Sequence, residues 1–174
     1  MEKETMSGRA FVLRMNPLGI DRVPIGRQTE EISIGWGKVG SALLNTALER
    51  EDFASLVHDT YYATARNRRG SGSATGQLWR FLRVMTAGDL VLVPHWEELH
   101  LARVEGEATY DTSPNAEHWA YRRTAQWLTG DRGLSRYQMD ESIRAAVRSR
   151  ITCIEAPALV RELEKLAAQA SVRR

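Results

Sequence analysis

The residues of this chain that suggest chemistry are tryptophans and arginines. Five tryptophans occur in 174 residues, and three of them stand where a core does not obviously need a large ring. Trp36 lies between two glycines, Trp96 lies in a charged turn, and Trp119 follows a polar loop. Exposed aromatic rings beside arginines are the groups on which proteins stack unpaired nucleic-acid bases. These three tryptophans are therefore candidate base-binding residues, with a structural role as the alternative, whereas Trp79 and Trp127 are expected in the core.

The positive charges are unevenly distributed along the chain. The net charge is only +2, yet arginines gather near positions 66–69 and 122–123, and acids gather at 30–31 and 49–52. Such segregation favours one basic face that binds a polyanion. Solvated loop arginines without a ligand are the alternative. The candidate phosphate-binding residues are Lys38, Arg66, Arg68, Arg69, Arg122 and Arg123.

Sequence support for catalysis is missing. The chain has no Walker loop, no GxGxxG after a strand, no HExxH and no CxxC. It also lacks the paired acids and lysine on adjacent strands that metal-dependent nucleases use. The four histidines are dispersed at His58, His95, His100 and His118, so we expect no metal site and no cofactor. We therefore expect a binding module rather than an enzyme.

Bulk properties fit one globular domain. A chain of 174 residues with 43% hydrophobic and 26% charged residues can bury a core without disulfides. The single cysteine, Cys153, lies in an apolar segment and should be buried. There is no apolar run of membrane-spanning length and no signal core. We therefore expect a cytoplasmic protein that does not bind membranes.

The elements that must position these residues follow from periodicity and turn signals. Helices are predicted from a Thr46 cap to about Tyr61, over 76–85, after Asp140 and after Pro157, and residues 66–76 are predicted as a mobile loop. Strands are predicted over residues 10–15, 31–36, 90–94, 99–104, 107–110, 121–128 and 151–154. The segments 90–94 and 99–104 are too close for a helical crossover and should form an antiparallel hairpin. This pattern predicts α+β with a curled antiparallel or mixed sheet.

The segment 76–95 gives the strongest local signal. Leu78, Phe81, Leu82 and Met85 have the spacing of one buried helix face. After a Gly-Asp turn, Leu90 to Val93 is apolar without alternation, which indicates a strand with both faces covered.

Several segments together resemble the N-terminal domain of predicted Mrr-type restriction endonucleases. They are residues 32–36, 76–81, 85–94, 102–106 and 121–128, in order along the chain. That domain is similar to the EVE and YTH members of the PUA-like superfamily, which are compact β-barrels with outer helices that read modified bases. The resemblance implies an α+β, PUA-like (EVE/YTH-like) curled barrel of about six strands with flanking helices. It covers most of residues 10–155, with residues 1–9 as a flexible tail and 156–174 as a C-terminal helix.

The resemblance also implies a site. In the YTH-like pattern, one cage tryptophan follows the second strand and another precedes a strand whose end, Trp127 in this chain, is also a tryptophan. These positions correspond to Trp36 and Trp119, with Trp96 as a candidate third wall. The chain departs from the pattern in a shorter loop around Trp119, and the pair His95-Trp96 stands where EVE sequences usually carry Tyr-His-Ser. The residues expected to contact the base edge or the pocket are Ser33, His95 and Asp89.

The implied function is recognition of a modified base, such as a methylated base, in DNA. The base would be flipped into an aromatic cage, and the domain would serve as the recognition module of a modification-dependent restriction system. Nuclease activity would then come from a fused domain or a partner subunit. An RNA-binding PUA-like module and a protein-interaction domain are the alternatives.

Overall fold

The backbone of residues 8–172 is described by the computed structural model, and its sheet follows the order β2-β6-β4-β3-β1-β8. β1 and β3 are parallel, whereas the other neighbouring pairs are antiparallel. The short strands β5 and β7 pair with β6 and β4. The strands are β1 (Ala10–Leu13), β2 (Glu31–Ile34), β3 (Leu90–His95), β4 (Glu98–Val104), β5 (Thr109–Tyr110), β6 (Tyr121–Trp127), β7 (Leu134–Ser135) and β8 (Cys153–Glu155).

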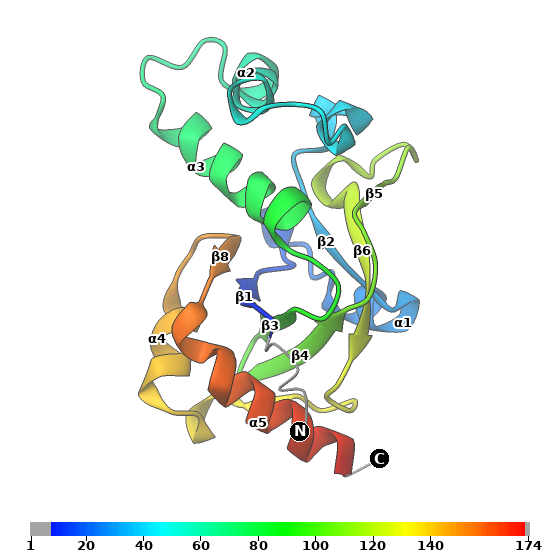
Figure 1. Cartoon of the computed structure of the whole chain (residues 1–174), viewed down its shortest axis with the longest axis vertical. Helices are drawn as coiled ribbons and strands as arrows, with labels where there is room; N and C mark the ends of the chain where they lie inside the picture. The colour runs from blue at the N-terminus through cyan, green and yellow to red at the C-terminus, as the bar shows by residue number, and fades with distance from the viewer. Residues whose placement is uncertain (1–7, 173–174) are drawn as a thin grey trace, which may run out of the picture.

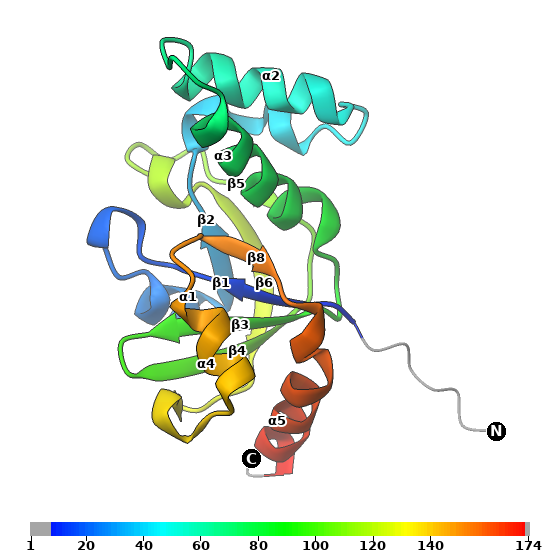
Figure 2. The same cartoon turned by 90° about the vertical axis from the view of Figure 1, so that its left-hand side faces the viewer.

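Helices cover both faces of this sheet (Figures 1 and 2). α2 and α3 lie on one side, and α4 and α5 lie on the other. The helices are α1 (Val23–Thr29), α2 (Arg50–Tyr61), α3 (Arg69–Trp79), α4 (Glu141–Arg148) and α5 (Val160–Val172). The α+β class with a strongly curled, mixed half-barrel sheet is thereby confirmed. Among residues 8–172, no helix has the length and apolar character needed to cross a bilayer.

The central strands separate two hydrophobic cores. Phe11 and Leu13 of β1 face the core under α2 and α3. Ala10 and Val12 face the core under α4 and α5. β3 alternates in the same way, so both faces of the segment predicted as a doubly covered strand are buried. The expected burial of Cys153 is confirmed as well.

The segment 76–95 positions the entry to β3. The four apolar residues predicted to form one helix face are all buried, and the helix ends in a π-helical turn over Arg80–Val84. The Asp89 carboxylate accepts hydrogen bonds at 2.8 Å from the backbone N–H groups of Arg9 and Thr86. Asp89 is therefore a structural residue that fixes this turn, which corrects its assignment as a base contact. The bond from Arg9 also shows that the end of the expected tail is held, whereas residues 1–7 lie outside the described chain.

Most of the segment predicted as a loop over 66–76 is helical. α3 begins at Arg69, and its small side chains Ser71, Ala74 and Thr75 are buried. Gly70 lies against the Tyr62 ring, where an added Cβ would be 3.1 Å from a ring carbon. Glycine and serine have weak helix propensity, so the local pattern indicates a loop. Close packing of α3 on α2 overrides that propensity.

Smaller differences concern the ends of elements. α2 begins at Arg50 after Glu49 rather than at a Thr46 cap, and β8 leaves out Ile151, which is exposed. The sequence analysis did not predict α1 or β7. The C-terminal helix packs into the second core through Leu159 and Leu163, while residues 173–174 lie outside the described chain.

Arg123 ties β6 to the end of the long helix. It is only 4% exposed, and its guanidinium donates hydrogen bonds to the carbonyl oxygens of Phe81, Gly106 and Leu82 at 2.8, 2.8 and 3.3 Å. Burial lowers its pKa from the ordinary arginine value. A guanidinium that is already bound to three carbonyls inside the protein cannot reach a phosphate. The assignment of Arg123 to phosphate binding is thus wrong.

Replacing this buried guanidinium should destabilise the fold. Arg123→Ala leaves three carbonyl groups without their donor, and each buried unsatisfied polar group costs about 1–3 kcal/mol. We expect the free energy of unfolding to fall by about 3 kcal/mol in urea denaturation. Arg68→Ala, at an exposed position, is the control and should change it by less than about 0.5 kcal/mol. Equal stabilities of the two variants would contradict the structural role of Arg123.

Candidate functional site

A pocket of about 370 Å³ opens where β2 ends. Its lining includes the aromatic residues Trp36 and Tyr61, together with His118. These three residues come from the end of β2, the end of α2 and the 3-10 turn Glu117–Trp119 before β6. Arg14 and Arg150 add positive charge to the lining. The lining therefore combines aromatic residues with cationic residues.

The backbone around Trp36 is unusual. Trp36 has a φ of 63°, in the left-handed region that bulky residues seldom adopt. On either side of it, a Cβ on Gly35 would lie 2.9 Å from the His118 carbonyl oxygen, and one on Gly37 would lie 2.6 Å from the Ala120 Cβ. The two glycines therefore let the Trp36 turn pack directly against the segment before β6. This contact brings Trp36 and His118 into one wall.

Tyrosine hydroxyls hold the chain that follows Trp36. Tyr61 Oη accepts a hydrogen bond from the Lys38 backbone N–H at 2.9 Å. Tyr110 Oη donates to the Gly37 carbonyl oxygen, and Tyr121 Oη donates to that of Gly40, both at 2.8 Å. Burial raises the pKa of Tyr61 and Tyr121, which keeps both phenols protonated at neutral pH. The turn is thus fixed before any ligand arrives.

The charges at the pocket are partly engaged. Tyr61 Oη donates to Glu117 Oε1 at 3.1 Å, and the same carboxylate lies 3.6 Å from Lys38 Nζ. Arg14 donates from Nε to the Ser149 carbonyl oxygen at 2.6 Å. Its pKa is lowered by burial and further by the nearby charges of Arg136 and Arg150. Arg150 is exposed and is the more accessible cation of the lining.

Trp119 adjoins the pocket but does not line it. The Arg22 guanidinium carbon lies 4.1 Å from the centroid of the Trp119 ring. A ring covered by a guanidinium is already stacked. The sequence analysis expected Trp36 and Trp119 to form the two walls of a cage. In the structure, Tyr61 and His118 stand beside Trp36 instead.

The remaining sequence candidates for base contacts lie elsewhere. Trp96 is 77% exposed in the β3–β4 turn and does not line the Trp36 pocket. His95 Nε2 lies 2.7 Å from Asp21 Oδ2. Ser33 is buried beside Arg122 in a separate small cavity of about 20 Å³. The structure therefore brings neither Trp96 nor the polar candidates to Trp36.

The candidate phosphate-binding residues differ in availability. Arg66, Arg68 and Arg69 are exposed in the connection that follows Tyr61 and in the first turn of α3. Lys38 is exposed as well. Arg122 is half-buried and forms ion pairs with Glu31, at 3.3 Å, and with Asp111. The three loop arginines and Arg150 are thus exposed cations, whereas Lys38 is exposed but paired with Glu117.

Sequence reasoning missed Tyr61 and His118 as pocket residues. Tyr61 was predicted only as the end of a helix, and as the last residue of α2 it lines the pocket. His118 was predicted only as one of four dispersed histidines. The sequence did contain a weak signal. His118 and Trp119 are two neighbouring rings before a strand, so one of them can pack against Arg22 while the other lines the pocket.

The comparisons with known proteins identify a family and no function. A search of curated proteins finds no significant match. The model of the DUF8426 family, which is described as a domain of unknown function, matches residues 26–149. This range includes Trp36, Tyr61 and His118, and it is more than half of the 174 residues. The chain therefore belongs to the DUF8426 family.

Proposed function

We propose that this domain reads a modified base in DNA by taking the flipped base into the Trp36 pocket. The observation that carries the proposal is the preformed pocket itself, with Trp36, Tyr61 and His118 in its walls and arginines in its lining. Its volume of about 370 Å³ lies within the usual range for small-ligand sites. A strained, non-glycine φ at Trp36 is also typical of functional positions.

In such a site, the free energy gained from stacking and burial is similar in size to the cost of flipping the base. Turning a base out of a duplex costs a few kcal/mol, and less when the base pair is weakened. Stacking on an aromatic side chain returns about 1–3 kcal/mol. Burial of a methyl group adds about 0.8 kcal/mol. Because the tyrosine hydroxyls already fix the Trp36 turn, little of this energy is lost in ordering the protein.

The nucleic-acid backbone would be held by the exposed cations around the pocket. Arg66, Arg68 and Arg69 lie in the connection that follows Tyr61 and at the start of α3, and in this proposal they contact phosphates next to the bound base. Lys38 and Arg150 extend this surface. Such contacts position the duplex and make binding salt-dependent without reading sequence.

The curled half-barrel is compatible with the PUA-like resemblance noted from the sequence. On that basis we propose that the domain is EVE/YTH-like and acts as the recognition module of a modification-dependent restriction system. Cleavage would be carried out by a fused or partner nuclease. The alternatives of RNA binding and of protein binding remain outcomes of the experiments below.

Removing the main wall of the pocket should abolish the preference for a modified base. Trp36→Ala should weaken binding to the modified duplex by about 5- to 150-fold, which corresponds to the 1–3 kcal/mol of base stacking, and the preference over the unmodified duplex should be lost with it. The measurement is competition binding at low salt between matched duplexes with and without 5-methylcytosine, 5-hydroxymethylcytosine or N6-methyladenine. Single-stranded RNA is included as a further competitor.

The matched control is Trp96→Ala, because Trp96 is an exposed tryptophan outside the pocket. It should leave the preference unchanged. Circular dichroism and a thermal melt establish that Trp36→Ala remains folded. Stronger competition by RNA than by any duplex would favour the RNA-binding alternative. If no nucleic acid binds at low salt, both nucleic-acid functions are refuted.

The loop arginines should set the salt dependence of binding. Each phosphate contact contributes a slope of about −0.9 in a plot of log K against log salt concentration on duplex DNA. Arg68→Ala should therefore weaken binding to all duplexes alike and flatten this slope by about 1. Arg144→Ala removes an exposed arginine from α4, which packs on the other core, and is the control. An unchanged slope in Arg68→Ala would remove the loop from the interface.

A further inference from the structure

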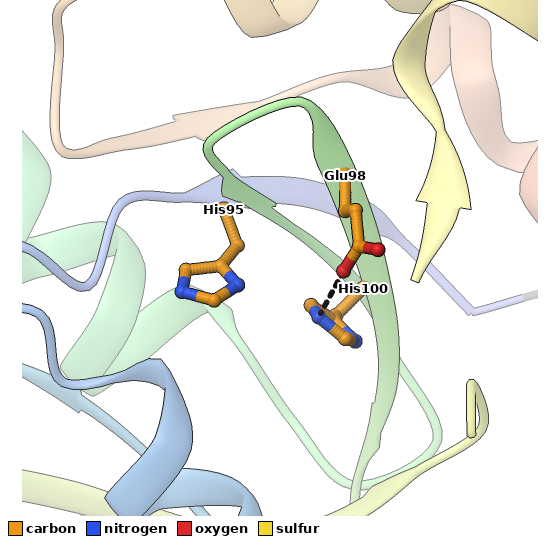
Figure 3. Close-up of side chains that lie close together, drawn as sticks. All are labelled: His95, Glu98 and His100. Atoms are coloured by element: carbon orange, nitrogen blue, oxygen red, sulfur yellow. Dashed lines mark ion pairs between the residues drawn. The ribbon is translucent and has the colours of Figure 1, made fainter. Parts of the chain in front are cut away.

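Three metal-ligating side chains meet at the β3–β4 hairpin. One potential ligand atom from each of His95, Glu98 and His100 lies within 4.8 Å of the other two. Figure 3 shows the His95 ring turned toward Glu98 and His100 across the hairpin. His100 Nε2 lies 3.7 Å from Glu98 Oε2, which is too long for a hydrogen bond. An ion bound at about 2.0–2.2 Å from each ligand separates neighbouring ligands by about 3–4 Å, so this pair already has ligand spacing.

Each of the three side chains also has a hydrogen-bonding partner outside the hairpin. His95 Nε2 lies 2.7 Å from Asp21 Oδ2, so the nitrogen that faces the cluster is Nδ1. His100 Nδ1 lies 3.0 Å from Thr129 Oγ1, which leaves Nε2 facing Glu98. These partners come from outside the hairpin. Histidines that bind metals almost always have their second ring nitrogen hydrogen-bonded in this way, because the bond fixes the tautomer and the ring orientation.

The carboxylate of Glu98 has a partner of its own. Its Oε2 accepts a hydrogen bond from the Gly133 backbone N–H at 3.1 Å. A Cβ on Gly133 would lie 2.8 Å from the Leu99 carbonyl oxygen and 3.2 Å from His100 Nε2, so glycine permits this close approach. All three candidate ligands are thus oriented by groups outside the hairpin, on the segment before α1 and on the connection between β6 and β7.

The charges around the cluster suit a bound cation. His100 is only 1% exposed, so the inner side of the cluster is shielded from water. Arg27 is the nearby opposing charge, but its guanidinium is bound to the carbonyl oxygens of Gly130 and Asp131. Glu98 and Asp21 supply the compensating negative charge.

We propose that His95 Nδ1, Glu98 Oε2 and His100 Nε2 bind one divalent transition-metal ion, with Zn²⁺ as the ion that fits this ligand set best. Two imidazoles and one carboxylate are borderline ligands that suit zinc better than calcium or magnesium. Three protein ligands leave a fourth position for water. The side chains of His95 and Glu98 are 21% and 39% exposed, so water can reach that position.

The experiment uses the full chain, stripped of metal with a chelator and then titrated with Zn²⁺ in competition with a chromophoric chelator. We expect one bound ion per chain. Co²⁺ should bind at the same place and give the visible absorption of a low-symmetry site, which Zn²⁺ then displaces. Zn²⁺ should also raise the thermal unfolding midpoint, because it binds the folded chain preferentially.

Variants of the ligands test the assignment. His95→Ala and Glu98→Gln should each weaken Zn²⁺ binding by at least about 100-fold, and Asp21→Asn should weaken it by about 10-fold as an outer partner. His58→Ala removes a histidine of α2 and is the matched control, with unchanged affinity. Unfolding of each variant in the absence of metal is measured first, so that a loss of binding is not a loss of fold.

Several outcomes would overturn the proposal. No stoichiometric binding of Zn²⁺ by the wild-type chain would do so. Unchanged affinity in both His95→Ala and Glu98→Gln, or an equal loss in His58→Ala, would show adventitious binding elsewhere. The proposal is independent of base recognition, since none of the three ligands lines the Trp36 pocket.

Discussion

The burial of both faces of β1 and β3 is the constraint on which the rest of the structure depends. Strands that are apolar on both sides cannot face water, so helices must cover each face. α2 and α3 cover one side, and α4 and α5 cover the other. The end of α2 is thereby placed beside the end of β2, where the pocket opens. The position of the candidate site therefore depends on how α2 packs on the sheet, although neither β1 nor β3 contributes a lining residue.

Close backbone contact decides the shape of that site. The glycines beside Trp36 allow its turn to touch the segment 117–120, and side chains there would force the two segments apart. Hydroxyl groups of Tyr61, Tyr110 and Tyr121 then bind the same turn from α2 and from the β5–β6 pair. Rigid positioning of this kind reduces the conformational entropy that the protein loses when a ligand binds.

Neighbouring arginines have different roles because their surroundings differ. Arg122 and Arg123 are adjacent on β6, so their side chains point to opposite faces of the sheet. Arg123 enters the core and binds carbonyl oxygens, whereas Arg122 pairs with acids at the surface. A cluster of like charges in a sequence therefore does not establish a binding surface. His95 and His100 are the opposite case, because they are not adjacent in the sequence but are brought together by the hairpin.

Local periodicity in the sequence was sufficient to predict the fold class, the hairpin, the buried helix face before β3 and the burial of Cys153. The flanking glycines and the family resemblance, rather than periodicity, made Trp36 a candidate site residue. Only the tertiary structure decided which rings stand beside Trp36, that α3 begins at Arg69 and that Arg123 is buried. The physical reason is the range of the interactions. Periodicity records which face of one element is apolar, whereas the pocket and the buried arginine depend on contacts between segments far apart in the chain.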